Sequence, residues 1–196
     1  MPVPEGDDLS LWIGRVVRSH AMLEYQADLI HRFICAHVDE PRQWKSVVSL
    51  DQVIADCRRR VESAADLRPD LRKAGVEALL AARKASNARN RVAHDMWLPH
   101  RVPEADETTT WAVFQRTGDP ALSYAAATRR ELDEVIEAHL RIERTRVRLS
   151  GLFMALHAIW EPGGDTSLVP RYIAMMTDQF HLAANGDVLL DGERPG

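Results

Sequence analysis

The segment between residues 87 and 97 contains side chains whose types and spacing suit chemistry at a phosphate group. Arg89, Asn90 and His94 fall within six consecutive positions. Arg89 can bind a phosphate through two parallel hydrogen bonds and offset charge that develops on its oxygens. An imidazole titrates near neutral pH, so His94 can accept or donate a proton. Asn90 lies one helical turn before His94, where its amide can hold the imidazole or bind phosphate.

Three further polar residues near this trio, Arg83, Asn87 and Arg91, could contact neighbouring phosphates through charge or hydrogen bonds. Residues 58–91 hold ten Arg and Lys against four Asp and Glu, although the whole chain carries a formal net charge of −4. The net charge argues against a protein that binds nucleic acids over its whole surface, whereas the local surplus can attract phosphates. On charge alone, a solvated helix face is the other interpretation.

The helix that must position these residues is predicted to run from about Pro69 to Trp97, and Pro99 and Pro103 follow it. Successive residues of a helix turn by about 100°, which gives this one two different stripes. One stripe starts apolar and becomes polar halfway along: Val76, Leu79, Leu80, Arg83, Asn87, Asn90 and His94. The opposite stripe has mostly small side chains: Ala78, Ala81, Ala82, Ala85, Ala88, Val92 and Met96. We expect the alanine stripe to pack into the protein and the polar turn to face a cleft, a second subunit or a ligand.

The rest of the pattern predicts a mostly helical protein. Apolar residues recur at helical spacing in three further segments, at about residues 8–38, 49–65 and 128–160. Thr128 and Glu131 form a capping box at the head of the last of these helices. Residues 107–126 are rich in β-formers and are predicted to be a β-hairpin or an irregular excursion.

The C-terminal segment is predicted to be an extension of the helical domain. A short helix is expected near residues 170–178, and Asn185-Gly186 marks a tight turn that could join a hairpin ending near residue 190. The tail after that is expected to be disordered. The predicted fold is therefore all-α, a four- to five-helix bundle with small β-hairpin decorations. The bundle domain would cover residues 1–160, and the extension residues 161–196.

Composition and missing motifs argue against several classes of protein. Cys35 and Cys57 form no Cys-x-x-Cys pair, so we expect reduced, buried thiols in a cytoplasmic protein. We find no signal-peptide pattern, no apolar run long enough to span a membrane and no Gly-rich phosphate loop. His94 and His100 lack further ligands at a fitting spacing, so neither a metal nor another cofactor is expected. Histidines beside apolar stripes are expected to be core or interface residues with hydrogen-bond partners: His20, His139 and His157.

The string Asn87-Ala-Arg-Asn-Arg-Val-Ala-His-Asp-Met-Trp97 resembles the active-site motif of the HEPN family of ribonucleases. The match consists of Arg89, a polar residue directly after it and His94 five residues on, all on a long predicted helix. The resemblance implies a four- or five-helix bundle that forms a homodimer, with the two copies of the motif facing each other. It also implies metal-independent RNA cleavage, in which a ribose 2′-hydroxyl attacks the adjacent phosphate and leaves a 2′,3′-cyclic phosphate.

The expected function is therefore an endoribonuclease of the toxin–antitoxin or anti-phage defence type, with RNA as substrate and an antitoxin protein as a candidate partner. The expected catalytic residues are Arg89, Asn90 and His94, and the expected RNA-binding residues are Arg83, Asn87 and Arg91. One alternative is a non-catalytic HEPN-like dimeric module that binds nucleotides or a protein partner. Another is a structural dimer with a buried interface network of Arg89 and His94. These two residues project about 140° apart on an ideal helix, so activity is expected to need two subunits.

Overall fold

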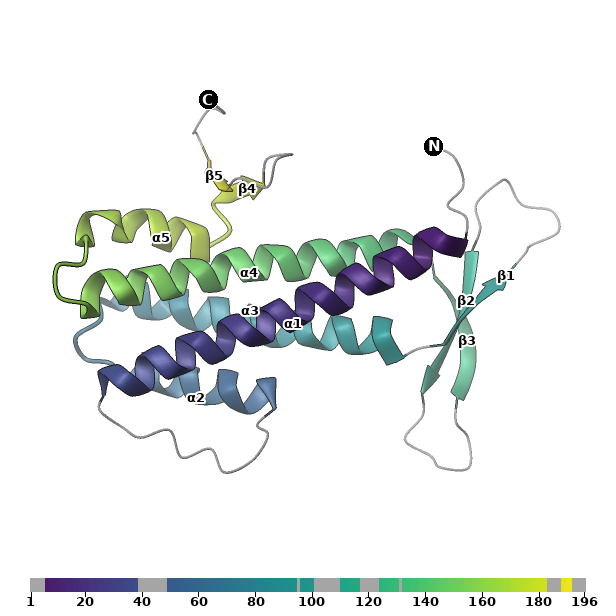
Figure 1. The fold of residues 1–196 in the computed structure, drawn as a ribbon, viewed down its shortest axis with the longest axis horizontal. Helices are drawn as coiled ribbons and strands as arrows, with labels where there is room; N and C mark the ends of the chain where they lie inside the picture. Colours follow the sequence, from purple (N-terminus) through teal and green to yellow (C-terminus); the bar gives the residue numbers. More distant parts are fainter. Residues whose placement is uncertain are drawn as a thin grey trace. The chain divides into compact units, whose positions relative to one another are not determined.

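The computed structural model describes residues 6–38, 49–94, 96–100, 110–116, 124–130, 132–182 and 188–191. Within them the protein is mostly helical, and the predicted helical bundle with small β elements is confirmed (Figure 1). The helices are α1 (Gly6–His37), α2 (Leu50–Ser63), α3 (Pro69–His94), α4 (Leu132–Trp160) and α5 (Val169–Met176), with a 3₁₀ helix at Thr166–Leu168. The strands are β1 (Met96–His100), β2 (Thr110–Arg116), β3 (Tyr124–Arg130), β4 (Phe180–Leu182) and β5 (Val188–Leu190).

The chain forms two compact units. The first consists of Met1–Ala21 and Ala85–Ile142, and the second of Met22–Lys84 and Glu143–Gly196. The first unit therefore holds the start of α1, the end of α3, the strands β1 to β3 and the start of α4. The second holds α2, α5, the hairpin β4–β5 and the remaining parts of α1, α3 and α4. The division of the chain at residue 160 that the sequence suggests stays a prediction.

The second unit is organised around apolar side chains from five helical segments. Its fully buried side chains include Leu23, Ile30, Ile34, Ile54, Leu71, Leu79, Leu149, Leu152, Leu156 and Met176. Helix α2 begins at a capping box, in which Ser49 and Gln52 each accept a hydrogen bond from the backbone N–H of the other. Helix α3 approaches α4 closely at Gly75, where a Cβ atom would lie 2.9 Å from Cδ1 of Leu152. The small residues of α3 thus serve packing, as the alanine stripe predicts.

Gly151 allows α5 to pack closely on α4. A Cβ atom at Gly151 would lie 2.9 Å from the carbonyl oxygen of Tyr172 and 3.0 Å from Cβ of Met175. Because a backbone carbonyl cannot move aside as a flexible side chain can, we expect Gly151→Ala to lower the free energy of unfolding by about 1–3 kcal/mol. Gly14 of α1 is the matched control, since a Cβ atom there meets nothing within 4 Å. Gly14→Ala should raise the free energy of unfolding by about 0.5–1 kcal/mol through helix propensity. Urea unfolding measures both, and equal changes would contradict the close approach of α5.

Helix α3 ends three residues earlier than predicted. The helix stops at His94, and Trp97 lies in strand β1 rather than in a last helical turn. Pro99 also belongs to β1, opposite Trp111 of β2. Strand β1 is at the edge of the sheet, whose order is β1-β2-β3, and an edge strand tolerates a proline because one of its sides needs no ladder hydrogen bonds. The chain therefore changes from helix to strand before Pro99, and Pro99 does not mark the end of the helix.

The capping box expected at Thr128 is wrong. Thr128 lies in strand β3 opposite Val113 of β2, and α4 begins at Leu132. The sequence predicts a β-hairpin or irregular excursion at residues 107–126. The structure has instead a three-stranded antiparallel sheet of β1, β2 and β3, with a register irregularity between Val113 and Gln115. Cross-strand pairing involves residues distant in sequence, so it can override a local capping signal.

The C-terminal predictions are confirmed where the structure describes them. Helix α5 occupies the expected position, and β4 pairs antiparallel with β5, with Phe180 opposite Leu190. The Asn185-Gly186 turn and the tail after Asp191 lie outside the described residues. In the described parts of the chain, no helix combines the length and apolar character that a membrane span needs.

Candidate functional site

The motif lies in the last turns of α3, in the first unit, with helical backbone through His94. Arg89 is half-buried, and its Nε atom has almost no contact with solvent. The side chains of Asn90, Arg91 and His94 lie outside the described residues. The motif is thus on a long helix, as predicted, and convergence of its side chains stays a prediction.

The two stripes of α3 differ in burial in part. On the first stripe, Leu79 is fully buried and Val76 and Leu80 are half-buried, whereas Arg83 and Asn87 are exposed. The small-residue stripe is buried at Ala78, Ala82, Ala85 and Val92 and half-buried at Ala81 and Ala88. In the second unit, Nε of Arg83 lies 3.5 Å from a carboxylate oxygen of Asp51.

One buried polar side chain lies on the same helix just before Arg89. Ser86 stands three residues before Arg89, and its Oγ is 3.0 Å from Nε2 of His20. His20 and Ser86 are both buried, and a second pair, Ser19 and His139, is joined by a 3.1 Å hydrogen bond. His20 and His139 therefore have the hydrogen-bond partners that the sequence predicts. In both pairs, a hydrogen bond offsets the free-energy cost of placing the polar groups away from water.

His157 is expected from the sequence to be either a core or an interface residue, and it does not lie in the core. Its side chain is exposed and stacks on Phe33, with the ring centroids 5.8 Å apart and the planes at 16°. Amphipathic rings often cover apolar surface in this way while one edge remains in water. An apolar stripe on a helix therefore does not determine which of its flanking histidines is buried.

The basic surplus between residues 58 and 91 is partly neutralised by local ion pairs. Among the described side chains, several of these basic residues have acidic partners: Arg58 with Glu62, Arg59 and Arg60 with Asp56, Arg68 with Asp70, and Arg83 with Asp51. Exposed ion pairs contribute little free energy in water. A phosphate can therefore compete for the exposed guanidinium groups, and the surplus fits a solvated helix face equally well.

A second polar cluster, which the sequence analysis missed, lies in the second unit. Nε2 of His31 is 2.8 Å from Oδ2 of Asp56, and Sγ of Cys35 is 3.6 Å from the same nitrogen. Arg60 donates to Oδ2 of Asp56 over 2.7 Å, and Arg59 binds Oδ1. His31 and Cys35 are four residues apart on α1, a spacing visible in the sequence. Their partner on α2 comes from the tertiary structure alone.

The charge state of this cluster follows from its partners. Burial by itself would raise the pKa of Asp56, but hydrogen bonds from Arg60 and His31 and the charges of Arg60 and Arg59 outweigh that effect. The pKa of Asp56 is therefore held below its usual value. Burial, with the nearby Asp56 carboxylate, raises the pKa of the Cys57 thiol far above its ordinary range. Cys35 and Cys57 are both buried and neither forms a disulfide, which confirms the predicted buried thiols.

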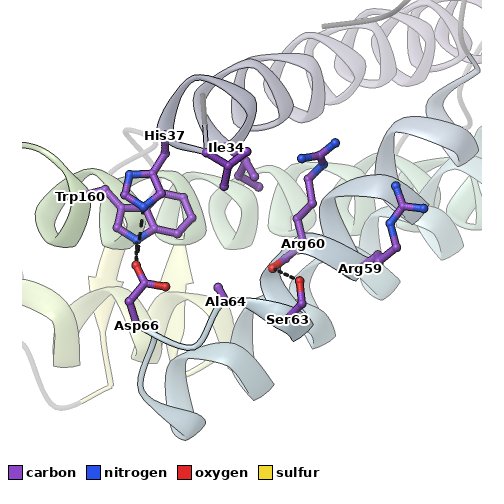
Figure 2. A pocket seen from close by; sticks show the side chains of 9 residues that line it. Ile34, His37, Arg59, Arg60, Ser63, Ala64, Asp66 and Trp160 are labelled. Atoms are coloured by element: carbon purple, nitrogen blue, oxygen red, sulfur yellow. Dashed lines mark hydrogen bonds and ion pairs between the residues drawn. The ribbon is translucent and has the colours of Figure 1, made fainter. Parts of the chain in front are cut away.

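A pocket of about 600 Å³ opens beside this cluster (Figure 2). It is lined by Ile34, His37, Val38, Arg59, Arg60, Ser63, Ala64, Asp66 and Trp160. His37 stacks on Trp160 with the centroids 4.0 Å apart, and Asp66 accepts a 2.6 Å hydrogen bond from Nε1 of Trp160. Arg59 and Arg60 both line the pocket and bind Asp56, so the pocket and the cluster adjoin.

Comparison of the chain with protein-family models, with curated proteins and with solved structures found no match. The resemblance to HEPN ribonucleases therefore rests on the sequence motif of Arg89, Asn90 and His94 and stays a prediction.

Proposed function

We propose that this protein is a metal-independent endoribonuclease that acts in the cytoplasm, of the kind used in toxin–antitoxin or anti-phage defence. The observation that carries the proposal is the motif Arg89-Asn90-x-x-x-His94 on the last turns of a long helix in a helical bundle. The half-burial of Arg89 and the buried hydrogen bond between His20 and Ser86, three residues before it, support a functional role for this end of the helix. An antitoxin protein would be the regulatory partner.

In the proposed reaction, the oxygen of a ribose 2′-hydroxyl forms a bond to the adjacent phosphorus. The bond between phosphorus and the 5′ oxygen of the next nucleotide breaks. A base takes the 2′ proton, and an acid returns a proton to the departing 5′ oxygen. His94 has the chemistry for either role, while Arg89 stabilises the charge on the phosphate oxygens. Asn90 orients the imidazole or binds the phosphate.

The proposed active form is a homodimer. On one ideal helix, Arg89 and His94 project about 140° apart, so they do not easily reach one phosphate. Two helices related by a two-fold axis solve this problem, because each cleft can use the arginine of one subunit and the histidine of the other. The exposed Asn87 and Arg83, with Arg91, would bind flanking phosphates by charge or hydrogen bonds.

RNA cleavage by the purified protein in EDTA tests the proposal. Incubation with total cellular RNA is expected to give fragments with 2′,3′-cyclic phosphate and 5′-hydroxyl ends. The 5′-hydroxyl ends accept a label from polynucleotide kinase without prior phosphatase treatment, which distinguishes them from the products of metal-dependent nucleases. Fragments with 5′-phosphate ends, or cleavage that needs added magnesium, would contradict the mechanism. RNA that is bound but stays intact would support the non-catalytic binding module instead.

A further inference from the structure

Three metal-binding side chains of different chemistry meet between α1 and α2 in the second unit. A nitrogen of His31, the sulfur of Cys35 and a carboxylate oxygen of Asp56 all lie within 4.8 Å of one another. The closest approach to the sulfur is from Nε2 of His31, at 3.6 Å. In a tetrahedral zinc site with a Zn–S bond of about 2.3 Å and a Zn–N bond of about 2.0 Å, these two ligand atoms would be roughly 3.5 Å apart. Nε2 of His31 and Oδ2 of Asp56, now 2.8 Å apart, would have to separate to roughly 3.3 Å to become two ligands of the same tetrahedral ion.

The donor set selects one class of metal. Thiolate, imidazole and carboxylate ligands suit zinc and similar transition-metal ions, whereas calcium and magnesium take oxygen ligands. His31 and Cys35 are four residues apart, so they project from the same face of α1. We propose that His31, Cys35 and Asp56 bind a zinc-class divalent ion that links α1 to α2.

The burial of the ligands limits the charge that the site can hold. His31 is 1% exposed and Cys35 is 5% exposed, so a net charge left among them would be costly. A divalent ion, one thiolate and one carboxylate have a combined charge of zero, and the positive charge that remains is that of Arg59 and Arg60, which bind Asp56 and are 74% and 20% exposed. Binding would release the thiol proton of Cys35 and replace the hydrogen bond between His31 and Asp56 with two metal bonds. Three protein ligands leave a fourth position for water.

The arginines around Asp56 determine how the ion would be accommodated. Arg59 binds Oδ1, the carboxylate oxygen that does not face His31, and can hold the carboxylate in place as an outer-shell partner. Arg60 binds Oδ2 and would share that oxygen with the ion or release it. Arg60 also lines the pocket of Figure 2, so its side chain borders open space on that side.

Cobalt(II) is the probe that tests the ligand set directly, because a cobalt–thiolate bond adds a charge-transfer band in the near ultraviolet. The tag-free protein is stripped with a chelator, exchanged into clean buffer and titrated with cobalt. We expect one equivalent to produce the band in the wild type and in Cys57→Ala, and none in Cys35→Ala. Cys57 is the matched control because it is a second buried cysteine without a disulfide, which directly follows Asp56 but lies outside the ligand set.

Thermal unfolding with zinc provides a second readout that needs no cobalt. At zinc concentrations 100-fold above the dissociation constant, the melting temperature should rise by about 5–10 °C. The rise should be absent in Cys35→Ala and in His31→Gln and present in Cys57→Ala. A folded wild type without a charge-transfer band, or a band that survives in Cys35→Ala, would overturn the proposal. Neither experiment uses RNA, so failure here leaves the proposed nuclease activity untouched, and failure to cut RNA leaves the metal site untouched.

Discussion

Replacement of His94 by alanine is expected to lower the rate of RNA cleavage by roughly 10²- to 10⁴-fold, the usual contribution of a positioned general acid or base. In a symmetric dimer with one histidine in each cleft, the substitution removes the imidazole from both clefts, so no wild-type cleft remains to mask the loss. Replacing Arg89 by lysine keeps the positive charge but removes the paired hydrogen bonds to a phosphate. The expected loss for Arg89→Lys is roughly 10²-fold, comparable to that of a missing oxyanion donor.

Two substitutions outside the motif control for nonspecific effects. Lys73 is an exposed basic residue on the same helix, sixteen positions before Arg89, and His181 is an exposed histidine in strand β4. Lys73→Ala and His181→Ala should cut RNA at the wild-type rate. Single-turnover cleavage of a defined RNA gives the rates, and circular dichroism checks the fold of each variant. Wild-type cleavage by His94→Ala would exclude the proposed role of the imidazole.

The oligomeric state of the same variants separates catalysis from architecture. If His94 acts only on RNA, light scattering should give the same mass for His94→Ala and the wild type. If both proteins leave RNA intact and the substitution abolishes a dimer, the residue belongs to an interface network. The measurement therefore decides between the nuclease and the structural dimer that the sequence leaves open.

The helices could be predicted from the sequence because their signals are local. Apolar spacing and the capping residues of α2 lie within the helix they specify, and α2 buries Val53, Ile54, Cys57 and Val61 on one stripe. The predicted helix boundaries are wrong where strand pairing between residues distant in sequence competes with a local helix signal. Thr128 carries a helix-capping signal, but it lies in β3 and pairs with Val113 of β2. Trp97 lies in β1, the edge strand of the same sheet. Such pairings depend on residues that local patterns do not connect.

The motif on α3 and the proposed metal site also differ in how far the sequence alone reveals them. The motif on α3 is a contiguous string, so it could be recognised without any knowledge of the fold. The cluster of His31, Cys35 and Asp56 combines a one-helix spacing with a carboxylate 21 positions further along the chain. Three residues of common types at such separations carry no signal in a single sequence. Only the packing of α1 against α2 brings them together.

Asp56 is expected to be the most destabilising carboxylate to remove among the ion-paired acidic residues of α2. Its side chain is 12% exposed and accepts hydrogen bonds from His31, Arg59 and Arg60. Asp56→Ala would leave the buried His31 without this acceptor and Arg60 without its counter-charge. Breaking a buried charge pair from one side costs about 3–5 kcal/mol. Glu62 is the matched control, because its ion pair with Arg58 at 3.4 Å is exposed, and Glu62→Ala should change stability by less than about 1 kcal/mol. Urea unfolding in a chelating buffer measures both variants without any contribution from bound metal.

The pH dependence of this difference follows from the pKa of Asp56. The pKa is lower in the folded protein than in the unfolded chain, where Asp56 loses its partners. The unfolded chain therefore binds the proton first as the pH falls, and the stabilisation is complete only above the unfolded pKa, which is about 3.9. The stability gap between the wild type and Asp56→Ala should be full at neutral pH, begin to shrink below about pH 5 and continue to shrink as the pH falls through the folded value. A gap of constant size from neutral pH to pH 3 would show that the substitution acts through lost packing, and that the charge of Asp56 does not hold α1 against α2.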